Sequence, residues 1–197
     1  MKRLTLALGA LVALAACHGL PSRPDLGPAP EARALVASIP DWRARGRVAV
    51  RSAAGGFSAS FDWHQTGERG ELGVHGPFGA GAARISRTPE LIRIESGQGP
   101  PVEVPWPFAT LEPALTARLG FPLPIESLRY WVLGVPAPGL SSEERSGSEF
   151  RQAGWTVSLA GFGPVNGAPG PLPSRLVLTR ESTRIRVIID TWHVGTP

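Results

Sequence analysis

The sequence predicts a mainly β domain of antiparallel strands into which two short helices are inserted. Three observations indicate this fold class. Glycine (24 residues) and proline (21 residues) are abundant, which favours turns and short strands over long helices. Apolar and polar residues alternate in many short segments, and a helical period occurs in only a few. The length of 197 residues, with 42% hydrophobic content, fits one domain with a substantial core.

Nine segments show the alternation expected of strands that are buried on one face. The clearest is "FSASFDWHQ", in which Phe57, Phe61 and Trp63 share one face and Asp62 and His64 share the other. The nine segments are 46–52, 57–65, 70–76, 82–88, 90–96, 149–154, 155–161, 174–179 and 184–190. In the last of them, the residues that we expect to face inward are Ile185, Val187 and Ile189.

Three segments have the pattern of short helices. Glu31–Ser38 opens the folded part and is stopped by Pro40. The segment 111–119 can be capped by Thr110, carries one stripe of leucines and ends at Gly120. The segment 125–133 has a second apolar stripe. Helices packed across a strongly curved sheet would cover its apolar face and leave room for a cavity that holds hydrophobic ligands.

The amino-terminal segment has the pattern of a bacterial lipoprotein signal. Lys2 and Arg3 precede the apolar run Leu4–Ala16, which is shorter than the roughly 20 residues that span a bilayer. The run ends in "LAAC", which resembles the lipobox whose cysteine is acylated and becomes the first residue. Cys17 is the only cysteine, so it has no disulfide partner in the chain. An ordinary signal peptide with a chance cysteine is the alternative interpretation.

These features divide the chain into three parts. We expect residues 1–16 to be a signal peptide, residues 17–30 an acylated N-terminus with a proline-rich tether, and residues 31–197 one folded domain. An acylated Cys17 would hold the domain at the periplasmic face of a membrane. His18 stands where an aspartate would retain a lipoprotein in the inner membrane, which favours the outer membrane.

Charge and motifs exclude several classes of function. The net charge of +4 falls to +2 without Lys2 and Arg3, and the other basic residues are scattered singly, which does not indicate nucleic-acid binding. No catalytic or metal-ligand motif is present, so we expect no enzyme, metal or cofactor. Asp62 and His64 could pair, most simply as a solvated surface pair. The segment "LSSEERSGSE", with Glu143 and Glu144, indicates a solvated loop and not an acid–base pair.

Five stretches taken together resemble the LolB family of outer-membrane lipoprotein receptors. They are "FDWHQTG" (61–67), "GPFGAG" (76–81), "PIESLRYWVLGVP" (124–136), "FRQAGWTV" (150–157) and "RIRVIIDTW" (184–192), and the resemblance covers about 42–192. It implies an incomplete, half-open antiparallel β-barrel with a helical lid over an apolar cavity for acyl chains, without catalysis or cofactor. It also implies a receptor that accepts lipoproteins from the periplasmic carrier LolA and inserts them into the outer membrane. The expected partners are LolA, acylated lipoproteins as cargo and outer-membrane lipid, and we expect a monomer.

The resemblance also assigns a membrane-insertion loop to Gly76, Pro77, Phe78 and Gly79. In the family this loop carries a protruding hydrophobic residue, usually leucine, that helps to place lipoproteins into the membrane. Phe78 occupies that position, and an aromatic side chain is also suited to a membrane interface. The alternative is that Phe78 folds back onto the edge of the barrel.

Ten apolar residues are candidates for the lining of the acyl-chain cavity. They come from the concave face of the first two strands and from the underside of the lid. For each of them, plain core packing is the alternative. The candidates are Val48, Val50, Phe57, Phe61, Trp63, Leu115, Leu119, Leu128, Trp131 and Val132. Two other functions stay open: an anchored protein that binds another lipid or hydrophobic ligand, and a structural outer-membrane lipoprotein with a filled core.

Overall fold

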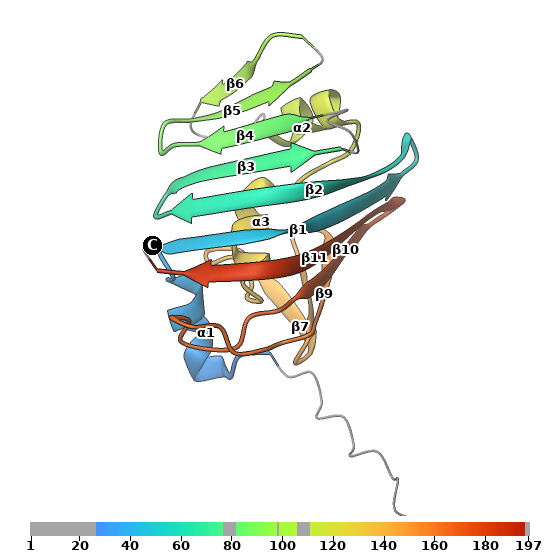
Figure 1. The fold of residues 1–197 in the computed structure, drawn as a ribbon. Coiled ribbons are helices and arrows are strands. Elements are labelled where there is room, and N and C mark those ends of the chain that lie inside the picture. The colour runs from blue at the N-terminus through green and yellow to red at the C-terminus, as the bar shows by residue number, and fades with distance from the viewer. Residues whose placement is uncertain (1–26, 77–81, 98, 106–110, 196–197) are drawn as a thin grey trace, which may run out of the picture.

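The computed structural model describes residues 27–76, 82–97, 99–105 and 111–195. These residues form one open sheet of eleven strands in the order β6-β5-β4-β3-β2-β1-β11-β10-β9-β8-β7, and all neighbours are antiparallel (Figure 1). The first and last strands lie side by side at its centre. The strands are β1 (Asp41–Ser52), β2 (Gly55–Thr66), β3 (Arg69–His75), β4 (Ala83–Arg87), β5 (Leu91–Ser96), β6 (Val102–Pro105), β7 (Ser142–Ser146), β8 (Glu149–Gln152), β9 (Trp155–Ala160), β10 (Arg175–Arg180) and β11 (Thr183–Val194).

Three short helices accompany the sheet. Helices α2 (Leu111–Leu119) and α3 (Ile125–Trp131) lie together on one face of the curved sheet, and α1 (Pro30–Ala37) lies near its lower end (Figure 1). This arrangement confirms the predicted fold class, a half-open antiparallel β-barrel with a helical lid. Thr110, the expected cap of α2, lies outside the described residues.

All nine predicted strands are present, and two further strands, β6 and β7, were not predicted. The expectation of a solvated loop at Glu143 and Glu144 is wrong, because both residues belong to the edge strand β7, which pairs with β8. All five residues of β7 are exposed. A strand with two solvated faces shows no alternation of apolar and polar residues, so the sequence pattern could not indicate it. Its charged residues suit an edge that must not pair with another chain.

The core lies between the concave face of the sheet and the helices. Alternate residues of the strands are buried there, as in β5, where Ile92 and Ile94 are completely covered. The predicted inward residues of β11 are buried as well. All the buried core residues that the structure describes lie between Val36 and Ile189, so a chain that begins after Cys17 retains all of them.

A β-bulge bends the two central strands where β1 faces β11. The register shifts between Arg45 and Gly46, so that β11 has one residue more than β1 at this point. A side chain on Gly46 would place its Cβ 1.9 Å from the carbonyl oxygen of Ile188. Only glycine allows this close approach of the two backbones, which contributes to the curvature of the sheet.

Helix α1 is attached to the edge strand β7 by a two-pronged ion pair. The Nη2 and Nη1 atoms of Arg33 donate to the Glu144 carboxylate at 2.5 and 3.2 Å. The hydrogen bonds from Arg33 lower the pKa of the Glu144 carboxyl below its ordinary value. The attachment should therefore be present above the ordinary carboxyl pKa.

We expect α1 to loosen as the pH falls through this lowered pKa, because protonation of Glu144 removes the charge that Arg33 binds. The effect is small, about 1 kcal/mol or less, because the pair is partly solvated. Hydrogen exchange of the α1 amides against pH measures it. Glu144→Gln should lower the protection factors of the α1 amides near neutral pH, and these factors, which are corrected for the intrinsic pH dependence of exchange, should not fall further in the acid range; an unchanged dependence of the protection factors on pH in this variant would contradict the assignment.

Candidate functional site

An apolar cavity of about 460 Å³ lies between the concave face of the sheet and the lid. Its size is within the range of ligand pockets, which span about 300–1,000 Å³. Its lining residues come from β1 to β4, β11, the end of β5, α2, α3 and the loop between the helices. They are Val48, Val50, Phe57, Ser58, Ala59, Phe61, Trp63, Leu72, Val74, Gly76, Ala82, Ala83, Ile85, Ser96, Gly97, Arg118, Leu119, Phe121, Leu123, Leu128, Val132, Ile185 and Val187.

The sheet side of the cavity follows from strand alternation. In β2, Ala59, Phe61 and Trp63 point inward and pair across the strands with inward residues of β1 and β3, such as Val48 and Val74. Ala59 is small, so it fills little of the concave side. The sheet thus presents apolar side chains without filling the space in front of them.

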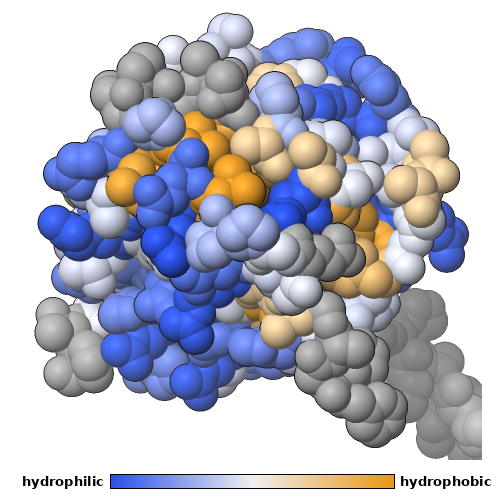
Figure 2. All heavy atoms as spheres, turned by 90° about the horizontal axis from the view of Figure 1, so that it is seen from above, coloured by the Kyte–Doolittle hydropathy of each residue, from blue (hydrophilic) through white to orange (hydrophobic). Residues whose placement is uncertain are grey.

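The lid side consists of residues that project from the two helices and from the loop between them. Leu119 ends α2, Phe121 follows it, and Leu128 projects from α3. The ring of Phe121 lies against the ring of Phe57 on the sheet, with their centroids 5.7 Å apart. This contact joins lid and sheet at the rim of the cavity, where Phe57 remains 42% exposed. Seen from above, hydrophobic residues are visible in recesses between hydrophilic ones (Figure 2).

A tryptophan cluster lies behind Trp63 and supports it. The ring of Trp63 packs against Trp42 at 5.1 Å, and Trp42 packs against Trp192 at 5.7 Å between centroids. Trp192 is fixed in turn, because its Nε1 donates to the carbonyl oxygen of Pro173 at 3.0 Å. Trp63 is therefore held rigidly with one side toward the cavity.

Eight of the ten candidate residues line the cavity: Val48, Val50, Phe57, Phe61, Trp63, Leu119, Leu128 and Val132. Leu115 and Trp131 are fully buried but belong to the packed core away from it. Trp131 points toward β8, where its ring lies near Phe150 and its Nε1 donates to Gln152. Helical stripes indicate which residues are buried, and they do not distinguish a filled region from a cavity.

Several lining residues were not among the candidates. Leu72 and Val74 of β3, Ile85 of β4, and Ile185 and Val187 of β11 all lie on the inward face of their strands. Their alternation was visible in the sequence, but only the strand order shows that these strands border β1 and β2. Phe121 and Leu123 lie in the loop between the helices, where no periodic pattern could indicate their direction.

The lining of the cavity is polar at one place, where Ser96 and Arg118 contribute to it. Ser96 is the last residue of β5, and its buried Oγ makes no hydrogen bond within the described part of the chain. Arg118 is in the last turn of α2 and donates to the carbonyl oxygen of Pro100. This bond attaches α2 to the turn between β5 and β6.

Only part of the predicted insertion loop belongs to the described residues. Gly76 lines the cavity, and so does Ala82 on the other side of the loop. Pro77, Phe78 and Gly79 lie outside the described residues, and so does the predicted lipidation site Cys17.

Asp62 and His64 do not pair with each other. Asp62 accepts a hydrogen bond from Arg45 Nε at 2.6 Å, and His64 Nε2 lies 3.3 Å from the hydroxyl of Thr66. Both residues lie on the outer face of β2, away from the cavity. The expected Asp62–His64 surface pair is therefore wrong, since each of the two residues has a different partner. Within the described ranges, no three His, Cys, Asp or Glu residues are grouped as a metal site requires.

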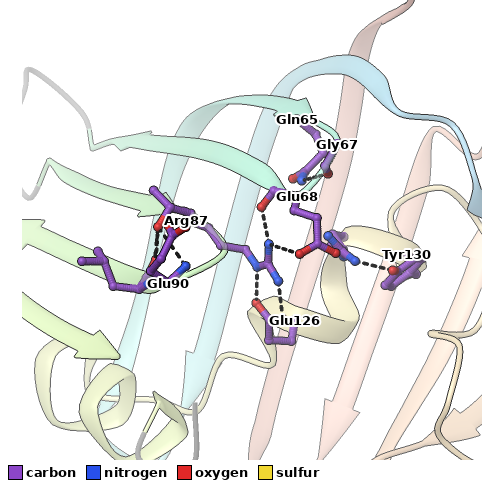
Figure 3. Close-up of polar contacts among 10 residues, drawn as sticks. Gln65, Gly67, Glu68, Arg87, Glu90, Glu126 and Tyr130 are labelled. Atoms are coloured by element: carbon purple, nitrogen blue, oxygen red, sulfur yellow. Dashed lines mark hydrogen bonds and ion pairs between the residues drawn. The ribbon is translucent and has the colours of Figure 1, made fainter. Parts of the chain in front are cut away.

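Helix α3 is attached to the sheet by Arg87, the last residue of β4 (Figure 3). Its Nε and Nη2 donate to the Glu126 carboxylate at 2.8 and 3.2 Å, and its Nη1 donates to the carbonyl oxygen of Glu68. Only 9% of the Arg87 side chain is exposed. One guanidinium thus joins the β2–β3 turn, β4 and the lid helix.

Replacement of Arg87 by alanine should reduce the free energy of unfolding by about 2 kcal/mol, because it removes charge-assisted hydrogen bonds from a side chain that is largely covered. Urea denaturation followed by circular dichroism measures the change. Arg84→Ala is the matched control on the same strand, since the Arg84 side chain is 58% exposed and pairs with the exposed Glu71; it should cost at most about 0.5 kcal/mol. Equal losses in the two variants would contradict the role of Arg87 in holding the lid.

No helix in the described segments is long and apolar enough to cross a membrane. The fold and the site define a class of protein: an open antiparallel half-barrel that shelters an apolar cavity under short helices. The chain matches the family described as outer membrane lipoprotein LolB over residues 40–192. It therefore belongs to the LolB family.

Relatives support this assignment along most of the chain. The outer-membrane lipoprotein LolB of Halorhodospira halophila is 38% identical over 162 residues, which cover 79% of this chain and 77% of the relative. That of Alkalilimnicola ehrlichii is 35% identical over 201 residues and 98% of each chain. A crystal structure of a DUF1329 family protein from Desulfovibrio piger shares the fold, with a TM-score of 0.51, 7% identity, and coverage of 83% of this chain and 89% of that chain.

Membership of the family establishes the broad role. The LolB family consists of outer-membrane lipoprotein receptors, so this chain is an outer-membrane lipoprotein receptor. The family is one of lipoprotein trafficking and is not known as a family of enzymes.

Proposed function

We propose that this chain receives the acyl chains of lipoproteins from LolA in the cavity between sheet and lid, and then releases them into the outer membrane. The observation that carries the proposal is the apolar lining of a cavity of about 460 Å³ on the concave face. A structural lipoprotein with a filled core would not need such a space. No catalytic group is required, because the proposed step moves a ligand and breaks no covalent bond.

The energetics suit an acceptor. Each exposed acyl methylene costs about 0.8 kcal/mol in water, so lipoprotein acyl chains must be covered at every stage of the transfer. A tenfold preference for this chain over LolA needs only about 1.4 kcal/mol. An adaptable hydrophobic lining that binds slightly more tightly than the donor would therefore give the transfer its direction.

The anchor of the proposed receptor is Cys17. We expect residues 1–16 to be removed, Cys17 to be acylated, and residues 17–30 to tether the domain 31–197 to the periplasmic face of the outer membrane. The family assignment to outer-membrane lipoproteins supports this part of the proposal. Cargo lipoproteins and LolA are the proposed partners, and the chain is expected to act as a monomer.

Release into the bilayer is assigned to the loop that contains Gly76, Pro77, Phe78 and Gly79. Support comes from its two ends, since Gly76 and Ala82 both line the cavity. Phe78→Glu should accept lipoproteins normally and deliver them slowly to vesicles, whereas Leu140→Glu, at an exposed leucine elsewhere, should leave delivery unchanged.

Acyl-chain occupancy can be tested with a triacylated peptide whose acyl chains carry bromine, a quencher of tryptophan fluorescence on contact. Trp63 is the one tryptophan of the described lining. We expect saturable quenching that is largely lost in Trp63→Phe and retained in Trp155→Phe, since Trp155 is buried outside the cavity. Quenching that is absent, or that is the same in both variants, would contradict binding in this cavity.

A further inference from the structure

Three arginines come together on the outer face of the sheet at the tips of two adjacent hairpins. The β1–β2 and β10–β11 hairpins end side by side at the right of the sheet (Figure 1). Arg51 of β1 lies directly opposite Arg184 of β11, and Arg186 lies opposite Ala49, two pairs further along the strands and on the same face. Residues far apart in the sequence thus form one basic cluster, although the sequence presents its arginines singly.

No carboxylate of the described residues forms an ion pair with this cluster. Arg45 and Arg47, earlier in the same strand, pair with Asp62 and Asp190 at 2.6 and 3.0 Å. The guanidinium groups of Arg51, Arg184 and Arg186 are exposed, and within the described ranges none of them has an ion pair.

The neighbouring turn also contains an acid, Glu181, which is exposed and makes no ion pair with the three arginines. Like charges directly opposite each other in a sheet are destabilising. The arrangement therefore costs stability unless an anion lies between the guanidinium groups.

The three arginines border a hollow of about 650 Å³. Its floor is made of residues with small side chains or none, which are Ala49, Ser52, Gly55, Gly56 and Ser58. Gly56 must be glycine, because a Cβ there would lie 2.8 Å from the carbonyl oxygen of Val50. The guanidinium groups around this floor are planar, and each carries several N–H donors. Together they form a concave site that is suited to phosphate oxygens.

The hollow and the apolar cavity lie on opposite faces of the same strands, and Val50, Phe57 and Ser58 border both spaces. Phe57, which is 42% exposed, belongs to the same hairpin as Arg51. A cationic hollow near an exposed aromatic ring suits the boundary between the polar and apolar layers of a membrane surface. An acidic protein surface would match the charge but not the exposed ring.

We propose that Arg51, Arg184 and Arg186 bind the phosphate of phospholipid headgroups, so that the tips of the β1–β2 and β10–β11 hairpins face the membrane surface. This site adds to the proposed function and does not depend on it, because contact with a membrane surface can be measured whether or not the chain accepts lipoproteins. Bound there, the phosphates would orient the cavity rim toward the bilayer into which acyl chains are released.

The test is sedimentation of the chain that begins after Cys17 with vesicles of pure phosphatidylcholine and with vesicles that also contain phosphatidylglycerol. We expect binding to rise with phosphatidylglycerol content. In the variant R51Q/R184Q/R186Q it should fall by roughly 100-fold on the phosphatidylglycerol vesicles, since each arginine near an anionic surface contributes roughly fivefold. The control R43Q/R69Q/R175Q removes the same charge elsewhere on the domain and should lose far less.

Three outcomes would overturn the proposal. The first is equal binding by the triple variant and the unchanged chain. The second is an equal loss in the control variant, which would show that only net charge matters. The third is inhibition by inorganic phosphate with no dependence on phosphatidylglycerol, which would assign the site to free anions.

The transfer of a lipoprotein from LolA, measured without vesicles, distinguishes this proposal from the receptor function. If the triple variant bound vesicles normally but failed in transfer, the cluster would serve protein docking, and the lipid assignment would be wrong. Transfer that fails in every form of the chain, with vesicle binding intact, would contradict the receptor function alone.

Discussion

Replacement of Val74 by glutamate should weaken acyl-chain binding roughly 100-fold while the domain stays folded. Val74 is half-buried on the inward face of β3, where it lines the cavity opposite Phe61. A carboxylate at this position stays hydrated while the cavity is empty, and it must lose its hydration shell when an acyl chain enters. A desolvation cost of about 3 kcal/mol corresponds to this loss of affinity.

The measurement is a titration with a fluorescent fatty-acyl probe, with circular dichroism to verify the fold. His75→Glu is the matched control, because His75 is the next residue of β3 and is exposed on the outer face. It adds the same charge but should change the affinity less than twofold. If the two variants bind the probe equally well, the acyl chains do not occupy this cavity.

The largest loss of stability is expected on replacement of Gln152 by leucine, on the order of 4 kcal/mol. Gln152 is buried in β8, and its Oε1 accepts from Trp131 Nε1 and from the amide of Ala137 at 2.8 and 2.7 Å. Its Nε2 donates to the carbonyl oxygens of Ala137 and Leu140 at 2.9 and 3.1 Å. Leucine has a similar size but would leave these groups without partners, at about 1–3 kcal/mol for each that stays buried.

Urea denaturation at equilibrium measures this loss, and Gln65→Leu provides the comparison. Gln65 is also buried in the sheet, but among the described residues its side-chain amide makes one hydrogen bond, to the carbonyl oxygen of Gly67 at 2.8 Å. This variant should lose only about 1 kcal/mol. Similar losses in the two variants would show that the end of α3 and the segment after it do not depend on Gln152.

The sheet was largely predictable from the sequence, because its strands are buried on one face and their residues alternate. The nine predicted strands had that pattern, and β7 did not, since both of its faces are solvated. The bulge at Gly46 could not be predicted either. It depends on the close approach of the Ile188 carbonyl, and that contact exists only once β1 and β11 are paired.

The sequence predicts that the cavity lining is apolar, but it does not predict which buried residues border the cavity. Leu115 and Leu119 belong to the same helical stripe, yet Leu115 is packed in the core and Leu119 lines the cavity. A stripe specifies which side of a helix is covered, whereas a cavity depends on how far the sheet curves away from that side. The basic cluster was missed for a related reason: Arg51 and Arg184 become neighbours through the pairing of the first and last strands.

The most direct test of the central claim is the transfer of a lipoprotein from LolA to the chain that begins after Cys17. LolA loaded with one lipoprotein is mixed with this chain in the absence of membranes, the two proteins are separated, and the lipoprotein is followed. The account predicts that most of the lipoprotein moves to this chain and that Val74→Glu prevents the transfer. A lipoprotein that stays on LolA, while circular dichroism shows the domain to be folded, would contradict it.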